Sequence, residues 1–143
     1  MTRAITDRPS DAEVIATACR RADAAMLAME DPTHTSSSEP TPVDLVHLFE
    51  SQAFLLVPTD CEAIVMAGDA ADGVPAMVEI TDCAPIDLRE RVRSLVWLNG
   101  TAHAVPRNLE RDLAVEIATE HPNGGLLDIG HGRSMIRLQV DRA

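Results

Sequence analysis

Apolar residues return every third or fourth position in two stretches of the chain, which is the spacing of a helix with one buried face. The first of these, and a further short stretch, open on a hydroxyl residue followed three positions later by Glu, a pair that caps helix N-termini. The other periodic stretch follows a proline and stops at a run of Pro and Gly. The first predicted helix covers about 11–29, with the capping pair Ser10 and Glu13 and with Met26 and Met29 in its buried stripe. The second covers about 59–66, with the capping pair Thr59 and Glu62. The third follows Pro106 and has the buried stripe Leu109, Leu113 and Ile117.

Elsewhere apolar and polar residues alternate, which is the period of a strand with one buried face. Segments 43–49 and 53–57 flank a short polar turn and predict an antiparallel hairpin. Residues 76–81 predict a further strand, and residues 135–140 predict the last one. The long stretch from 88 to 105 fits one bent strand or two joined strands, in which Asn99-Gly100 marks a bulge or a hairpin.

The order and spacing of these elements predict the fold class. Most connections between the predicted strands are too short for parallel crossovers. We therefore expect an α+β fold, a small antiparallel barrel of about six strands with about three helices packed outside it. The whole chain, 1–143, is expected to form a single domain, and the Pro- and hydroxyl-rich segment 31–42 is expected to be a flexible surface loop.

Charge and composition exclude several function classes. Twelve basic and 23 acidic residues give a net charge of −11, which repels nucleic-acid backbones and anionic membrane surfaces. All the basic residues are Arg, so a Schiff-base lysine and a P-loop lysine are excluded. The five scattered histidines and the lack of a Cys pair predict no metal site. The chain shows no bilayer-spanning run and no signal-peptide pattern, and its three cysteines are expected to be reduced, so we expect a cytoplasmic protein.

Three arginines form the first candidate binding site. Arg89, Arg91 and Arg93 are two residues apart, so in an extended strand their side chains would share one face. Such a row suits a phosphate or a pair of carboxylates on a small anionic ligand. The alternative is a solvated strand face whose arginines pair with neighbouring acidic residues.

The second candidate is His131, which lies between Gly130 and Gly132. Its imidazole is a candidate ligand of a heme iron or hydrogen-bond partner of a cofactor, and the alternative is a tight turn held by backbone hydrogen bonds. Trp97 is the third candidate, because the sequence has only one Trp, two Phe and no Tyr to contact a planar ligand. No residue stands out as an acid, base or nucleophile, so whether the protein is an enzyme stays open.

Two segments resemble a known family: 75–98, which begins Pro-Ala-Met-Val-Glu-Ile-Thr, and 126–138, Leu-Leu-Asp-Ile-Gly-His-Gly-Arg-Ser-Met-Ile-Arg-Leu. They are similar to the actinobacterial-type FMN-binding split-barrel proteins, which are pyridoxamine 5'-phosphate oxidase-like, and most similar to the heme-utilisation branch. The resemblance covers the barrel domain only. It implies a six-stranded split barrel that forms a homodimer, with FMN or heme in a groove between the barrels. In that branch a further C-terminal helical domain helps to hold the heme.

Two functions follow from these observations. The first is a dimeric split-barrel protein that binds a flavin- or heme-like cofactor, with a link to heme or iron utilisation implied by the resemblance. Arg89, Arg91 and Arg93 would take the anionic end of the cofactor, and His131 and Trp97 would contact the rest. The second is a dimerisation or regulatory module that binds no cofactor and performs no catalysis.

Overall fold

The computed structural model of the protein describes residues 11–21, 24–30, 40–83 and 92–142. Within these residues it has three α-helices, one 3₁₀ helix and seven strands. In chain order the elements are α1 (Asp11–Arg21), β1 (Ala24–Met29), β2 (Thr41–Pro42), β3 (Leu45–Phe49), β4 (Gln52–Pro58), α2 (Glu62–Asp69), β5 (Val74–Cys83), β6 (Val92–Ala104), α3 (Arg107–Glu120), the 3₁₀ helix η1 (Gly124–Asp128) and β7 (Arg133–Arg142).

The strands form one antiparallel sheet in the order β2-β1-β5-β6-β7-β4-β3. Its two edge strands, β2 and β3, are neighbours in the chain and are separated only by Val43 and Asp44. The amide of Val43 donates to the carbonyl of Ala25 in β1 at 2.9 Å, and the amide of Asp44 donates to the carbonyl of Leu56 in β4 at 2.9 Å. These two residues therefore connect both ends of a curled sheet that its strand ladder leaves open.

This architecture confirms the predicted fold class, an α+β fold with an antiparallel split barrel and flanking helices. The described strands number seven, against about six expected. Two of them were not predicted as strands: β1, and Thr41–Pro42, which pairs with Met26 and Leu27 and lies at the end of the predicted loop 31–42. The remainder of that loop, 31–39, lies outside the described residues.

Two hydrophobic clusters stabilise the sheet, one on each side. The inner cluster fills the concave side with residues from every long strand, and Cys19 of α1 and Ala63 and Ala67 of α2 pack against it. The outer cluster lies between the other side of the sheet and α3 with η1, and its members are Leu45, Phe54, Leu56, Val105, Ala114, Ile117, Leu126, Ile129 and Met135. Strand β4 contributes to both clusters, so five consecutive residues of this strand are buried.

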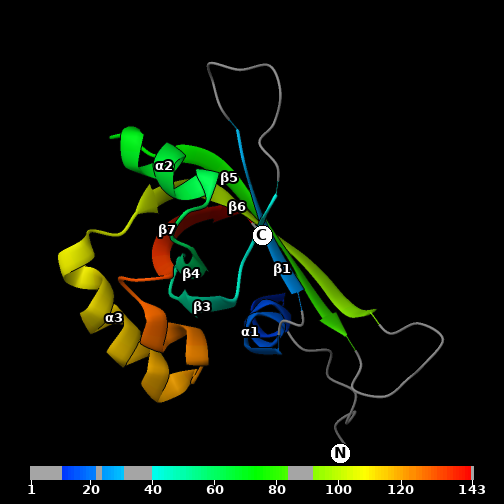
Figure 1. Ribbon diagram of the computed structural model, residues 1–143. Helices are drawn as coiled ribbons and strands as arrows, with labels where there is room; N and C mark the ends of the chain where they lie inside the picture. The colour runs from blue at the N-terminus through cyan, green and yellow to red at the C-terminus, as the bar shows by residue number, and fades with distance from the viewer. Residues whose placement is uncertain (1–10, 22–23, 31–39, 84–91, 143) are drawn as a thin grey trace, which may run out of the picture.

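Three of the strands reach beyond the part of the sheet that α3 covers (Figure 1). Strand β6 has 13 residues, but β7 pairs with it only from Asn99 onward. Within the described residues, the segment from Val92 to Leu98 is therefore hydrogen-bonded to β5 alone. Together with β1 these strands form an arm whose convex side no buried cluster covers.

The prediction of one helix over 11–29 is wrong in its second half. The helix ends at Arg21, and 24–29 form β1, in which Ala25, Leu27 and Met29 are buried and Met26 is exposed. The sequence Ala-Ala-Met-Leu-Ala-Met fits a helical stripe and a strand alternation equally well. Pairing with β2 and β5 decides between them, because sheet formation depends on tertiary neighbours more than on local propensity.

The prediction for the third helix is correct in position and for most of its buried stripe. Ile117 is buried and Leu113 packs against the outer cluster, whereas Leu109 is 47% exposed and Glu110 and Ala114 are buried as well. The Oε1 atom of Glu110 accepts a hydrogen bond from the amide of Met135 at 3.2 Å. A buried carboxylate needs such a partner, and the pattern of apolar residues does not reveal it.

The other sequence predictions agree more closely with the structure. The hairpin of 43–49 and 53–57 is confirmed as β3 and β4. The stretch around Asn99-Gly100 is one strand with a register shift, so the bulge is correct and the hairpin is not. The short helix starts at Glu62 rather than Thr59, whose hydroxyl instead lies 3.0 Å from that of Ser134.

Candidate functional site

The convex side of β1, β5 and β6 carries an apolar surface, which we call the open face. The strand register places its side chains in rows that run across the three strands. The three rows are Ala24–Thr81–Leu95, Met26–Glu79–Trp97 and Ala28–Met77–Asn99. Met26, Leu95 and Trp97 are 38%, 42% and 43% exposed.

Strand alternation accounts for the open face. The inward residues of the same strands, among them Leu27, Val78 and Leu98, are fully buried in the inner cluster. Their outward neighbours include large apolar side chains where a solvated strand would carry polar ones. Large exposed apolar side chains gathered on one face favour a site of interaction with a ligand or another protein.

Trp97 lies in the middle row of the open face and is held by its neighbour on β5. The indole Nε1 donates a hydrogen bond to Oε2 of Glu79 at 3.1 Å. This contact satisfies the one polar atom of the ring and limits its rotation. The aromatic surface of Trp97 is therefore available to a flat apolar partner.

A groove opens at one end of the open face, beside the row Ala28–Met77–Asn99. Its volume is about 660 Å³, which is within the size range of small-molecule sites. The groove is lined by Ala28, Met29, Glu30, Pro75, Ala76, Met77, Asn99, Gly100 and Asp141. Glu30 and Asp141 are exposed, and no cationic residue is among the described residues that line the groove.

The groove is shaped by the bulge at Gly100. The register of β6 and β7 shifts between Asn99 and Gly100. A Cβ atom on Gly100 would lie 1.9 Å from the carbonyl oxygen of Gln139, so only glycine allows the two backbones to approach this closely. Bulges often re-aim strands beside functional sites.

Only part of the predicted arginine row lies within the described structure. Arg89 and Arg91 are outside the described residues, and for Arg93 the structure describes the backbone but not the side chain. That backbone lies in β6 at a second register shift, between the pairs Val92–Cys83 and Ser94–Asp82. It is at the opposite end of the β5–β6 arm from the groove.

His131 lies in an exposed tight turn before β7. Its amide donates to the carbonyl of Asp128 at 3.1 Å, and the amide of Gly130 donates to the carbonyl of Arg133 at 3.0 Å. Gly130 has a φ of 85°, a conformation that favours glycine. The carboxylate of Asp128 lies against Gly132, and a Cβ atom on Gly132 would be 2.3 Å from the Oδ2 atom of Asp128. The backbone contacts match the tight-turn alternative for this motif.

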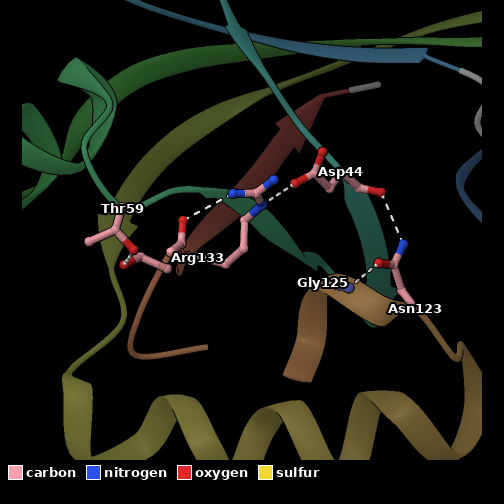
Figure 2. A network of polar contacts seen from close by, with 7 residues as sticks. Asp44, Thr59, Asn123, Gly125 and Arg133 are labelled. Carbon is pink, nitrogen blue, oxygen red and sulfur yellow. Dashed lines mark hydrogen bonds and ion pairs between the residues drawn. The ribbon is translucent and has the colours of Figure 1, made fainter. Parts of the chain in front are cut away.

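A network of polar contacts joins this turn and the start of β7 to Thr59 and Asp44, and joins η1 to Asp44 (Figure 2). The carbonyl of Gly132 accepts a hydrogen bond from the amide of Thr59 at 3.0 Å. Arg133 forms an ion pair with Asp44, and the amide group of Asn123 bonds the Asp44 carbonyl at 3.2 Å and the Gly125 amide at 2.8 Å. These contacts fix η1 and the start of β7 against the segment before β3.

The structure does not bring His131 and Trp97 together within one chain. His131 lies two residues before the first residue of β7. The last residue of β7, Arg142, pairs with Asn99 of β6, and Trp97 lies two residues before Asn99 in the chain. The whole of β7, ten residues or about 30 Å of extended strand, lies between these positions along the sheet. Within one chain the two residues are therefore found at opposite ends of β7.

A second, smaller cleft contains polar groups that sequence reasoning did not assign to a site. It lies between α1, β3 and the end of α3, has a volume of about 240 Å³, and is lined by Ala16, Cys19, Val46, His47, Leu48, Glu120 and His121.

Burial and the nearby His47 lower the pKa of His121 from its usual 6.5, and burial raises the pKa of Cys19 to about 11. The Cys19 thiol is thus protonated and unreactive near neutral pH. The histidines are far apart in sequence, so only the fold reveals this cleft.

The structure gives two further findings on the classes of site considered above. Among the described residues, no group of three or more His, Cys, Asp and Glu side chains is arranged to hold a metal ion. None of the described helices combines the length and the apolar character needed to cross a membrane.

Comparison with known proteins supports the fold. No family model and no curated protein matches the sequence. Among solved structures, the FAD and heme binding protein from Mycobacterium smegmatis is similar, with a TM-score of 0.58 and 14% identity over 92% of this chain and 67% of that chain. A protein of unknown function from Agrobacterium tumefaciens has a TM-score of 0.54 and 17% identity over 99% of this chain and 60% of that chain. This chain therefore spans less than two thirds of the second protein, and both similarities establish the fold alone.

Proposed function

We propose that the protein is a homodimeric split-barrel protein that binds a flavin- or heme-like cofactor at its open face, where two barrels meet. The observation that carries this proposal is the apolar open face around Trp97, which continues into a groove of about 660 Å³. An apolar surface with an aromatic ring and an adjoining groove suits a flat ring system such as FMN or heme.

The same surface supports the homodimer. In the described residues the open face is uncovered, and the first half of β6 has a free hydrogen-bonding edge. A two-fold axis would bring two copies of one apolar patch into contact and remove both from water. The groove would then lie at the margin of the interface, closed on its open side by the second subunit.

Two lines of support favour a flavin or a heme over other flat ligands. The similar structure from Mycobacterium smegmatis is a FAD and heme binding protein. The sequence itself resembles the FMN-binding split barrels and their heme-utilisation branch. We assign the anionic end of the cofactor to Arg89, Arg91 and Arg93 and the ring contact to Trp97. His131 belongs to the same site only as a residue brought to it by the second subunit.

The charge of the groove supports a second function, a dimerisation or regulatory module without a cofactor. Glu30 and Asp141 line the groove, and the chain carries a net charge of −11. Acidic lining opposes binding of an anionic cofactor. In this alternative the open face serves only to hold two subunits together.

Titration of the purified protein with FMN and with hemin, followed by ligand absorbance, distinguishes the two functions. We expect a spectral shift with one of the ligands at micromolar concentration. Trp97→Ala removes the ring contact and should weaken binding about ten-fold, because aromatic stacking on a planar group contributes roughly 1–3 kcal/mol. Phe49→Ala is the matched control, since Phe49 is 58% exposed and lies off the open face. No spectral shift with either ligand contradicts cofactor binding and favours the second function.

A further inference from the structure

We propose that the free edge of β6 is where two copies of this chain join, as antiparallel strands paired about Leu95, so that the two open faces form one surface. The free edge is the segment from Val92 to Leu98, which within the described residues is hydrogen-bonded to β5 alone. This inference rests on the proposed homodimer, and it adds which strand pairs with which and in what register.

The register of β5 shows which backbone groups of β6 point toward this edge. The amide of Glu30 donates to the carbonyl of Pro75 at 3.0 Å, so Pro75 and every second residue after it in β5 face β1. The residues between them face β6, where their partners are the even-numbered residues from Ser94 to Gly100. The N–H and C=O groups of Leu95 and Trp97 therefore point away from β5, to the free edge.

The other end of β6 gives the same orientation independently. Val105 directly follows β6, and its amide donates to the carbonyl of Met135 in β7 at 3.2 Å. Odd-numbered residues of β6 thus face β7 wherever the two strands pair, and this pairing ends at Asn99. Beyond that point the same side of β6 presents unpaired N–H and C=O groups, which are a template for a strand of another chain.

A second copy of the same segment fits this template. A two-fold axis pairs a strand with itself about one residue, and Leu95 is the middle residue of Val92–Leu98. Pairing about Leu95 uses the whole free segment and sets Trp97 opposite position 93 of the second copy. Because the strands run antiparallel, the two barrels lie at opposite ends of the paired segment, and the groove beside Asn99 lies at its margin.

The residues of the free edge favour this association. The segment reads Val-Arg-Ser-Leu-Val-Trp-Leu and has no Pro, no Lys and no acidic residue. Edge strands that stay unpaired usually carry Pro or charged residues that prevent such pairing. In a chain with a net charge of −11, a segment without carboxylates also spares the two copies local repulsion. Leu95 lies directly opposite its own counterpart, and apolar pairs across strands stabilise a sheet.

Cross-linking through introduced thiols tests the register. In Leu95→Cys the two thiols lie on directly opposite residues, about 5.5 Å apart between Cα atoms, which is within the range of a disulfide. Mild oxidation or a short bis-maleimide should therefore link the subunits, as seen on a non-reducing gel. Met26→Cys is the matched control, because Met26 is similarly exposed on the same open face but lies on β1. In the proposed dimer its two copies are about five strand spacings, or roughly 24 Å, apart and should not link. The wild-type protein gives the background from the natural cysteines.

Proline at the same position tests the edge hydrogen bonds. Leu95→Pro removes an amide that faces the free edge, so the single chain should keep its fold, which circular dichroism checks. Leu95→Ala is the matched control, because it also lacks the leucine side chain but keeps the amide. Dimerisation of Leu95→Pro should be at least about ten-fold weaker than that of Leu95→Ala, since the two-fold axis doubles the loss of each hydrogen bond. Light scattering over a concentration series measures both.

The outcomes separate this inference from the proposed homodimer. A wild-type protein that is monomeric at micromolar concentration contradicts both. A dimer that links through Met26→Cys as readily as through Leu95→Cys, or through neither, overturns the inference and leaves the homodimer standing. Equal dimerisation of folded Leu95→Pro and Leu95→Ala overturns it as well. If Leu95→Pro does not fold, the cross-links alone decide.

Discussion

Gly100 has no room for a side chain, because a Cβ atom there would overlap the backbone of Gln139. Backbone atoms cannot move aside as a flexible side chain can, so the strands would have to separate locally. At the scale of one residue, this position decides both the bulge and the shape of the groove. Gly68 presents the opposite case, since a Cβ atom there meets nothing within 4 Å.

Alanine substitutions at these two glycines should change stability in opposite directions. Gly100→Ala is expected to lower the free energy of unfolding by about 2 kcal/mol or more, through strain between β6 and β7. Gly68→Ala in α2 is expected to raise it by about 0.5–1 kcal/mol, because alanine loses less conformational entropy in a helix. Urea unfolding of both variants measures these changes, and a stable Gly100→Ala protein would refute the close approach of the strands.

His121 should make stability depend on pH. Its pKa is lowered in the folded state by burial and by His47, so the unfolded chain binds a proton more readily. Stability from this residue is fully present above its usual pKa of 6.5 and is lost as the pH falls toward the lower folded value. The free energy of unfolding should therefore drop more between about pH 7.5 and about pH 5.5 in the wild type than in His121→Asn. His131→Asn, on the exposed turn, serves as the control, and an equal drop in His121→Asn contradicts the assignment.

Strand β4 links the two hydrophobic clusters because it is buried on both sides. Its inward residue Leu55 belongs to the inner cluster, and the next residue, Leu56, belongs to the outer one. At the scale of the element, this strand couples the packing of α3 and η1 on one side of the sheet to the packing of the barrel interior on the other. The two clusters should for this reason unfold together.

Truncation of β4 tests this connection. Leu56 is fully buried, so Leu56→Ala should lower the free energy of unfolding by about 2–5 kcal/mol in a single transition. Leu109→Ala in α3 is the matched control, because the side chain is 47% exposed and its loss should cost far less. Two separate transitions in chemical denaturation would show that the clusters are independent.

The sequence predicted elements well where one period was unambiguous. Alternation located the hairpin of β3 and β4, β5 and β7, and Pro106 located the start of α3. The sequence pattern failed for 24–29, where small and flexible apolar residues satisfy both the helix period and the strand period. It also missed the burial of Glu110 in α3, which depends on a partner 25 residues away.

The candidate site was less predictable than the fold. Trp97 was selected for its rarity, and its place on an apolar face agrees with a ligand contact without testing it. The groove depends on β1, β5, β6 and β7, so Glu30 and Asp141 meet only through sheet register. Sequence spacing gives no sign of such a pair, since more than a hundred residues separate them.

For the whole molecule, the proposed function makes the open face the surface through which two subunits associate. A homodimer through this face would bury Leu95 and Trp97, which are 42% and 43% exposed in the single chain. Burial of such side chains drives association, and a charge placed among them opposes it.

The substitution Leu95→Glu should therefore shift the protein from dimer to monomer. Light scattering after size-exclusion chromatography gives the mass directly, and the single chain has a mass of 15.4 kDa. Val115→Glu on α3 adds the same charge at a position that is 63% exposed and should leave the dimer intact. A wild-type protein that is monomeric at micromolar concentration would exclude the proposed interface.

The link formed by Val43 and Asp44 has a consequence for the motions of the whole chain. Two adjacent peptide groups bond opposite ends of the sheet, one to β1 and the other to β4. Neither end of the sheet can separate without breaking one of these hydrogen bonds, so local unfolding at one end is coupled to local unfolding at the other. The amide protons of these two residues should accordingly exchange with solvent as slowly as those of the central strands, although their chain segment lies at the rim.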